Sequence, residues 1–272
     1  MKKRKKRFSA AILGVVLAAV YCNFALDLED WTVTSDRLPA VFDGLRVTVL
    51  TDLHGARFGD NSQRLLDAVT QSKPDLIAIC GDLADEYTDR TMLDPLLQGL
   101  AEIAPSYYVT GNHEWVRSDT EDLLAQIAAC GVTVLRNDYI PLERDGQLLV
   151  LAGVEDPNGY RDQETPAAFT ERIRREVGGD PYILMLCHRN NTLALWSSLE
   201  ADLVLAGHGH GGVIRLPLVG GLLGVDRQFF PDDAEGLYTQ GRTTLAVSRG
   251  VGGARLFNRP HLPTIILKGA IP

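Results

Sequence analysis

The chain has 272 residues, of which 45% are hydrophobic and 23% are charged, and these fractions exclude an intrinsically disordered protein. Its formal net charge is −8, but six of the first seven residues are positive, so residues 8–272 carry −14. An acidic protein of this kind repels the phosphate backbone of nucleic acids, which argues against a nuclease.

The chain begins with a basic tail, residues 1–7, followed by 19 residues without a charged side chain, residues 8–26. A helix of that length spans roughly 28 Å, close to the hydrocarbon thickness of a bilayer of about 30 Å. A buried helix is the alternative, but a basic tail before an uncharged stretch is typical of a signal peptide or an anchor. No small-x-small cleavage site follows, so we expect an uncleaved single-pass anchor in the cell membrane. The rest of the chain is then extracytoplasmic, or secreted if the segment is cleaved.

Residues 27–43 are interpreted as a linker and first strand region, after which β-rich apolar runs alternate with helical patterns. Strands at 46–52 and 75–82 with a helix over 61–72 between them form the signature of a β–α–β unit. Further strands are predicted at 106–112, 132–136, 148–154, 182–188 and 202–208, and further helices near 91–103, 119–129, 166–177 and 192–199.

The end of the chain has a different pattern. From Gly212 onward, short strands and Gly-rich turns predict antiparallel hairpins that finish a second sheet. No Pro- or Ser-rich linker divides residues 40–272. We therefore expect a single α/β catalytic domain over residues 44–272.

Polar side chains gather just after the carboxyl ends of the predicted strands, where open α/β sheets bind their ligands. They are Asp52, His54, Asp82, Asp85, Asn112, His113, His188, His208 and His210. A single histidine is usually structural, but five of the six histidines fall at this edge. Carboxylate, amide and imidazole groups together suit manganese, iron, zinc or cobalt rather than calcium. A carboxylate can bridge two such cations, and Asp82 is the best candidate for the bridge.

The blocks DLH, GDLAD, GNHE, a separate His and GHGH, in this order, resemble the calcineurin-like metallophosphoesterase family over residues 44–268. The resemblance implies a two-sheet sandwich flanked by helices, with two divalent metal ions between the strand ends. It implies a first metal held by Asp52, His54, Asp82 and His210, and a second held by Asp82, Asn112, His188 and His208. It also implies that His113 protonates the leaving oxygen or stabilises transition-state charge, with Asp85 orienting it.

The activity implied by the resemblance is hydrolysis of a phosphodiester or pyrophosphate bond by a metal-bridging hydroxide, because two cations lower the pKa of a bridging water. The N-terminal segment is similar to that of the membrane-associated bacterial phosphodiesterase branch. Some relatives in that neighbourhood cleave the pyrophosphate of lipid-linked uridine nucleotides, so we expect a lipid- or nucleotide-linked substrate.

Three points remain open in the sequence. Arg189 directly follows His188 and is a candidate contact for a substrate phosphate, with a structural or solvated arginine as the alternative. The segment NRPHLPTIIL departs from the arginine and proline-glutamate that the family often has before its last strand, which affects packing or substrate fit but removes no ligand. A noncatalytic metal-binding scaffold that presents a protein or membrane partner is the alternative function, although a scaffold has no use for His113.

Overall fold

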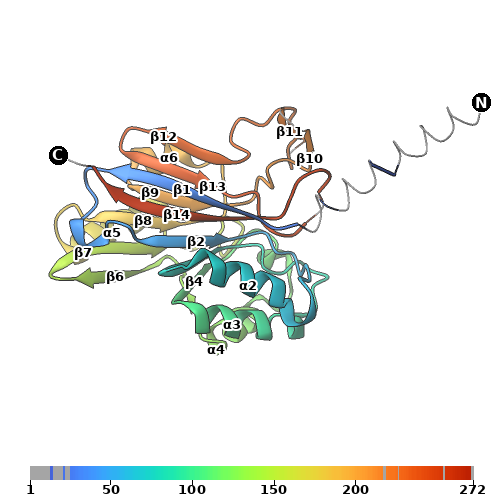
Figure 1. The fold of residues 1–272 in the computed structure, drawn as a ribbon. Coiled ribbons are helices and arrows are strands. Elements are labelled where there is room, and N and C mark those ends of the chain that lie inside the picture. The colour runs from blue at the N-terminus through green and yellow to red at the C-terminus, as the bar shows by residue number, and fades with distance from the viewer. Residues whose placement is uncertain are drawn as a thin grey trace, which may run out of the picture.

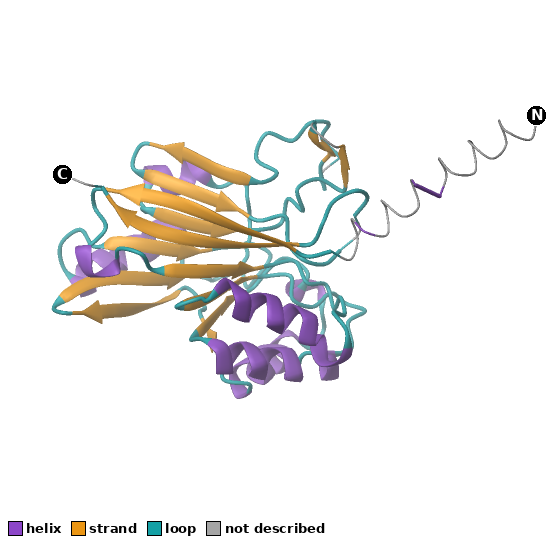
Figure 2. Cartoon of the chain, viewed as in Figure 1, coloured by secondary structure: helices purple, strands orange, loops and turns teal. Residues whose placement is uncertain are grey.

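A computed structural model describes residues 13–14, 21, 25–216, 219–225, 227–253 and 255–270. Two six-stranded sheets pack face to face, and helices cover the outer side of each sheet (Figures 1 and 2). This arrangement is the predicted two-sheet α/β sandwich.

The first sheet has the strand order β1-β14-β2-β3-β4-β5, and its strands β2 to β5 are parallel to one another. Their bounds are β1 (Asp27–Ser35), β2 (Arg46–Leu50), β3 (Leu76–Cys80), β4 (Ser106–Val109), β5 (Thr133–Val134) and β14 (His261–Gly269). The helices that cover its outer face are α2 (Gln63–Ser72), α3 (Asp94–Ile103) and α4 (Thr120–Ala129).

The second sheet has the order β12-β13-β9-β8-β7-β6, with parallel pairing from β7 through β8 and β9 to β13. Its bounds are β6 (Asp138–Arg144), β7 (Gln147–Gly153), β8 (Tyr182–Leu186), β9 (Leu203–Ala206), β12 (Gly236–Gln240) and β13 (Thr243–Val247). The helices α5 (Pro166–Val177) and α6 (Leu193–Ser198) cover it, and a separate hairpin joins β10 (Ile214–Leu216) to β11 (Gly220–Leu223).

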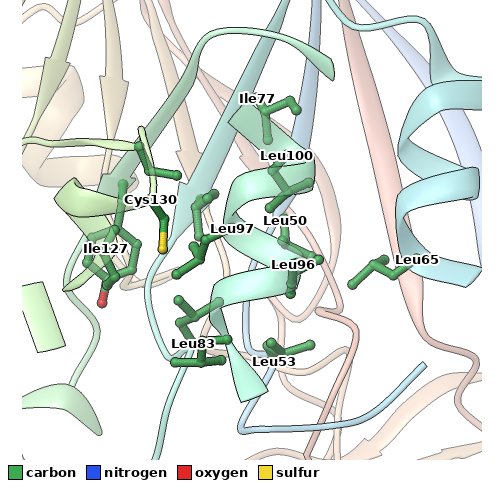
Figure 3. Close-up of a cluster of buried hydrophobic side chains, with 14 of the residues drawn as sticks. Leu50, Leu53, Leu65, Ile77, Leu83, Leu96, Leu97, Leu100, Ile127 and Cys130 are labelled. Atoms are coloured by element: carbon green, nitrogen blue, oxygen red, sulfur yellow. The ribbon is translucent and has the colours of Figure 1, made fainter. Parts of the chain in front are cut away.

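Side-chain alternation along the strands divides the apolar residues among three buried layers. In β2, Val47 and Val49 face the other sheet, whereas Leu50 joins the cluster beneath α2, α3 and α4. Leu65 of α2 lies in the same cluster, which Figure 3 shows as a set of leucine and isoleucine side chains from strands and helices. Because the central strands are apolar on both sides, they form a rigid base for the loops that follow them.

Two strands differ from the sequence predictions. β6 was not predicted, because it is a largely exposed edge strand whose sequence, DYIPLER, contains a proline, a residue that argues against a strand unless the strand lies at a sheet edge. β14 was expected in the second sheet with the other late strands, but it lies in the first sheet between β1 and β2. Most residues of β14 are buried. A position between two strands buries such an apolar strand better than a position at the edge of a sheet.

The predicted membrane segment at residues 8–26 and the basic tail at residues 1–7 lie almost wholly outside the described residues. The described part of the chain contains no helix with the length and apolar character that a membrane crossing requires. The residues that follow the segment enter the first sheet at once, because β1 pairs with β14 from Asp27 opposite His261 to Ser35 opposite Gly269.

Gly153 marks a close approach between the two sheets. A Cβ atom at this position would lie 2.6 Å from Val109 Cγ1 of β4 and 2.6 Å from Leu135 Cβ. We expect Gly153→Ala to lower the free energy of unfolding by about 1–3 kcal/mol through overpacking, as measured by urea denaturation. The control is Gly269→Ala, whose Cβ would meet only Asp43 Oδ1 at 3.9 Å. A Gly153→Ala protein with wild-type stability would contradict this packing.

Candidate active site

The predicted ligands come together where strands of both sheets end. The first sheet contributes residues that follow β2, β3 and β4, and the second sheet contributes residues that follow β8 and β9. In chain order they are Asp52, His54, Asp82, Asn112, His188, His208 and His210. Residues up to 158 positions apart in the chain thus converge on one edge of the sandwich, as expected for parallel strands with a common carboxyl edge.

One group of candidate ligand atoms is formed by Asp52, His54 and His210, with Asp82 beside it. His210 Nε2 lies 3.4 Å from Asp52 Oδ1 and 3.3 Å from His54 Nε2. His54 Nε2 is also 3.6 Å from Asp82 Oδ2. The ligand atoms of Asp52, His54 and His210 are all within 4.8 Å of one another, a spacing that one metal ion can bridge.

A second group is formed by Asp82, His188 and His208, with Asn112 beside it. His188 Nε2 lies 3.2 Å from Asp82 Oδ2, 3.2 Å from Asn112 Oδ1 and 3.2 Å from His208 Nδ1. Asp82 therefore stands between the two groups, in the position of a bridging carboxylate. The division of these residues between two metal ions has the composition that the sequence predicted, and each individual assignment stays a prediction.

The backbone of the ligand loops adopts costly conformations. Positive φ angles of 53°, 47°, 52°, 66° and 52° occur at Asp52, His54, Asp82, His208 and His210. Residues with a Cβ atom rarely adopt this left-handed region, and such strain gathers at functional sites, where the surrounding structure enforces it. The strain directs these side chains toward a common centre.

Glycines let the ligand loops approach one another. Gly81, immediately before Asp82, has a φ of 79°. A Cβ atom there would lie 2.6 Å from Gly111 N and 2.8 Å from His188 Nδ1. The loops after β3, β4 and β8 can therefore meet only because position 81 lacks a side chain.

The protonation states of the histidines fit divalent metal ions. Burial lowers the pKa of His54, and it lowers the pKa values of His208 and His210 to about 4, so these imidazoles are neutral at pH 7 and have lone pairs for a metal. Burial also acts to lower the pKa of His188, but the nearby Asp82 and Asp52 carboxylates outweigh it and raise this pKa to about 10. A bound cation would take the place of that compensating proton.

Two further features support a fit to cations. Burial and the neighbouring Asp82 charge raise the pKa of Asp52, although the nearby His188 acts to lower it, so the ionised Asp52 carboxylate gains from a nearby positive charge. His188 Nδ1 lies 2.8 Å from the carbonyl oxygen of Cys80 and donates to it, which leaves Nε2 directed at the centre. The described donor set thus suits two divalent metal ions.

Glu114 is a functional residue that the sequence reasoning missed. Its side chain is buried, and its carboxylate accepts hydrogen bonds from the backbone N–H groups of Asp82 at 3.0 Å, Ala84 at 3.0 Å and Gly111 at 2.7 Å. It thereby holds together the loops after β3 and β4. The sequence did contain a signal for it, because Glu114 is the acidic residue directly after Asn112 and His113 in the GNHE block.

His113 lies at the mouth of the site. Its ring packs edge-on against His54 with 4.8 Å between centroids, and its backbone N–H donates to Asp82 Oδ1 at 2.9 Å. The side chain is 38% exposed, and its imidazole also groups with His54 and Asp82 within metal-binding range. Geometry alone therefore allows His113 to act either as a proton donor or as a ligand.

The carboxylate that lies beside the His113 imidazole is that of Glu86 rather than that of Asp85. Glu86 Oε2 is 3.5 Å from His113 Nδ1, without the alignment of a hydrogen bond. The Asp85 carboxylate instead accepts hydrogen bonds from Thr88 Oγ1 at 2.7 Å and Tyr87 N at 3.1 Å, so it stabilises the turn after β3. The orienting role predicted for Asp85 stays a prediction.

Arg189 has a buried partner that the sequence did not reveal. Its Nε and Nη2 atoms form a bidentate ion pair with Asp156 at 2.6 Å and 3.0 Å, and Asp156 is almost fully buried. Its Nη1 atom lies 3.2 Å from His208 Nε2. Arg189 is therefore fixed at the edge of the second group, and its contact with a substrate phosphate stays a prediction.

The profile of the calcineurin-like phosphoesterase family matches residues 45–212, which is more than half of the chain. The chain therefore belongs to the calcineurin-like phosphoesterase family. The predicted family is confirmed, and so is the predicted enzyme class, a metal-dependent phosphoester hydrolase.

Similar proteins agree with this assignment. Phosphodiesterase YaeI of Escherichia coli is 30% identical and covers 82% of this chain and 82% of its own length. The uncharacterized metallophosphoesterase YkuE of Bacillus subtilis is 28% identical over 98% of this chain and 99% of its own length. A Danio rerio transmembrane protein with a metallophosphoesterase domain is 27% identical over 97% of this chain and 64% of its own length. The crystal structure of TT1561 from Thermus thermophilus shares the fold, with a TM-score of 0.50 at 14% identity over 75% of this chain and 88% of that chain.

Removing the Glu114 carboxylate tests its role in holding the loops. Glu114→Ala leaves three buried N–H groups without an acceptor, so we expect a loss of about 3 kcal/mol or more in unfolding free energy and a loss of bound metal. Glu114→Gln keeps one acceptor oxygen and is expected to lose less of both. Urea denaturation and elemental analysis measure the two effects. Full stability and full metal content in Glu114→Ala would mean that the loops are held by other contacts.

Proposed function

We propose that the protein hydrolyses a phosphodiester or pyrophosphate bond at a centre of two divalent metal ions, with manganese, iron, zinc or cobalt as candidates. The observation that carries this proposal is the pair of ligand groups that share Asp82. Further support comes from the phosphodiesterase of E. coli, which is 30% identical to this chain. A lipid- or nucleotide-linked substrate is part of the proposal.

When bound, the metal ions supply Lewis-acid stabilisation of the phosphoryl oxygens and lower the pKa of water. The described residues prepare the site for that chemistry. The Glu114 carboxylate fixes the loop that carries Asp82, and the hydrogen bond from His188 Nδ1 to the Cys80 carbonyl directs its other ring nitrogen to the centre. His113 is the exposed imidazole at the mouth, from which a proton can reach the leaving oxygen.

Replacing His113 and His208 separately distinguishes a proton donor from a ligand. We expect His113→Ala to keep nearly all of its metal and to lose about 100- to 10,000-fold in kcat for an alkyl phosphodiester. The loss should be smaller for a phenyl phosphodiester, because its phenolate leaving group needs little protonation. We expect His208→Ala to lose metal and to lose activity on both esters together. The measurements are metal stoichiometry and kcat on both esters.

Each other outcome has a distinct meaning. A His113→Ala protein without metal would make His113 a ligand, as its grouping with His54 and Asp82 permits. Equal losses on both esters would remove the proton-donor role. A metal-loaded wild-type protein that hydrolyses no phosphate ester would favour the alternative function, a noncatalytic scaffold that presents a protein or membrane partner.

We also propose that residues 8–26 anchor the protein in the cell membrane with the catalytic domain outside. The uncharged sequence of that segment supports the proposal, as does the transmembrane relative in Danio rerio. A further argument is a group of exposed apolar side chains after the β10–β11 hairpin, among them Phe229 at 69% and Phe230 at 56% exposure. Phenylalanine side chains exposed at a surface can be buried at the boundary between the headgroups and acyl chains of a bilayer.

Ion pairs connect the start of β1 with the segment that follows these aromatic residues. Arg249 contacts Asp27 of β1 at 2.6 Å and Glu235 at 2.5 Å, and Glu235 also pairs with Arg215 of β10. The β10–β11 hairpin and the point where the chain enters β1 lie at the same end of the molecule (Figure 1). A membrane that holds the segment before β1 would therefore face the same end of the molecule as the loop that follows β11.

Protease accessibility tests this topology. With the basic tail inside, protease added to cells stripped of any outer envelope should digest the catalytic domain, while the full-length chain fractionates with membranes. A cytoplasmic protein of the same cells, protected in the same sample, is the control. Digestion only after the inner membrane is permeabilised would place the domain in the cytoplasm, and recovery of a shortened chain in the medium would show cleavage.

A further inference from the structure

A cavity of about 500 Å³ opens beside the candidate metal centre. His208 and Gly209 form one side of it, the beginning of α6 forms a second side, and the described loop residues 224–225 and 227–234 form a third. Asn190 Nδ2 donates a hydrogen bond at 2.9 Å to the carbonyl oxygen of Asp233, which fixes this loop next to the metal ligands. A phosphate held at His208 would therefore have one of its ester groups in this cavity.

The formal charges that line the cavity are all negative. Asp232 and Asp233 line it, and the described lining residues include no lysine or arginine. Neither carboxylate has an ion-pair partner among the residues that the structure describes. Arg189, whose Nη1 atom lies 3.2 Å from His208 Nε2, is already paired with Asp156. A second negative group placed in this cavity would meet two lining carboxylates, and no described lining residue supplies a compensating positive charge.

The remaining walls mix apolar side chains with the uncharged amides of Asn190, Asn191, Gln228 and Gln240. Leu193 and Ala194 of α6, Val225 of the loop and Leu245 of β13 line the cavity, together with the ring of Tyr238. The Tyr238 hydroxyl donates to the carbonyl oxygen of Glu235 at 2.5 Å, so the ring is held in place. Apolar walls bind alkyl groups, and a fixed aromatic ring near carboxylates also suits a cationic group.

We propose that this cavity binds one alcohol group of a phosphodiester substrate and selects an uncharged or cationic group, such as an alkyl chain or an amino alcohol. A group that carries a second phosphate or a carboxylate is disfavoured there. The inference rests on the proposed hydrolase function and narrows its substrate class toward simple and amino-alcohol diesters and away from pyrophosphate-linked ones. It concerns the ester group beside His208, whereas the candidate metal ligands would hold the ions that bind the scissile phosphate.

The experiment uses the full-length, metal-loaded protein and three esters with a common p-nitrophenol leaving group. They are p-nitrophenyl phosphocholine, ethyl p-nitrophenyl phosphate and p-nitrophenyl 2-carboxyethyl phosphate. We expect kcat/KM for the choline and ethyl esters to exceed that for the carboxyethyl ester by about tenfold or more, the order expected for unit charges ~10 Å apart at an effective dielectric constant of about 20. A carboxyethyl ester that is cleaved as fast as the ethyl ester would overturn the inference.

Variants connect the preference to the cavity. The double variant Asp232→Asn with Asp233→Asn should reduce the choline-to-carboxyethyl ratio by about tenfold at unchanged metal content. The control is Asp145→Asn, an exposed acidic residue in the β6–β7 turn, which should leave the ratio unchanged. An unchanged ratio in the double variant would show that these carboxylates do not set the preference.

Failure of the proposed function is distinguishable from failure of this inference. If no ester is hydrolysed by the metal-loaded protein, the hydrolase proposal fails, and calorimetric binding of the same three esters then tests the cavity. Tighter binding of the choline ester than of the carboxyethyl ester would support the inference, and equal or reversed affinities would overturn it.

Discussion

The burial of the Asp82 carboxylate is the constraint on which the rest of the site depends. A buried charge is costly unless it is paired and hydrogen-bonded. Asp82 meets this condition through the backbone N–H of His113 and through imidazoles from both sheets, His54 on one side and His188 on the other. Burial acts to raise the pKa of Asp82, but the charge and hydrogen bond of His188, the backbone N–H of His113 and the nearby His54 together outweigh it and hold this pKa well below its usual range. The carboxylate is thus kept ionised for divalent cations, and its partners can reach it only if the two sheets align their strand ends.

That alignment explains features of the fold that are unrelated to the ligands' own chemistry. The apolar layer between the sheets fixes the distance between β3 and β8, whose following residues meet at Asp82 and His188. Where backbones must approach more closely than side chains allow, glycine occupies the position, as at Gly81. Glu114 then satisfies the backbone donors that these tight turns expose. The core, the glycines and the buried glutamate therefore form one support for the ligand loops, as precise sites require.

The sequence allowed prediction of which candidate ligands gather at one edge, because each follows an apolar strand pattern and the strands of such a sheet share one carboxyl edge. It did not allow prediction of the supporting contacts. Whether Asp85 or Glu86 lies nearer His113 depends on the shape of one turn, and the Arg189–Asp156 pair joins residues 33 positions apart with no local signal. The position of β14 depends on which sheet offers two free neighbours, which is a tertiary property. The walls of the cavity come from three separate segments for the same reason.

The site and the cavity differ in how they are built, and this difference bears on function. The candidate ligands follow central strands of the two sheets, where backbone geometry is fixed by packing on both sides. The cavity beside them is formed by the short helix α6 and a loop outside the sheets, where insertions and substitutions disturb little of the core. One fold can keep a single reaction chemistry on its strands while its loops change the group that is accepted. Family membership therefore fixes the reaction class, whereas the substrate must be inferred from the charge and shape of this chain's own loops.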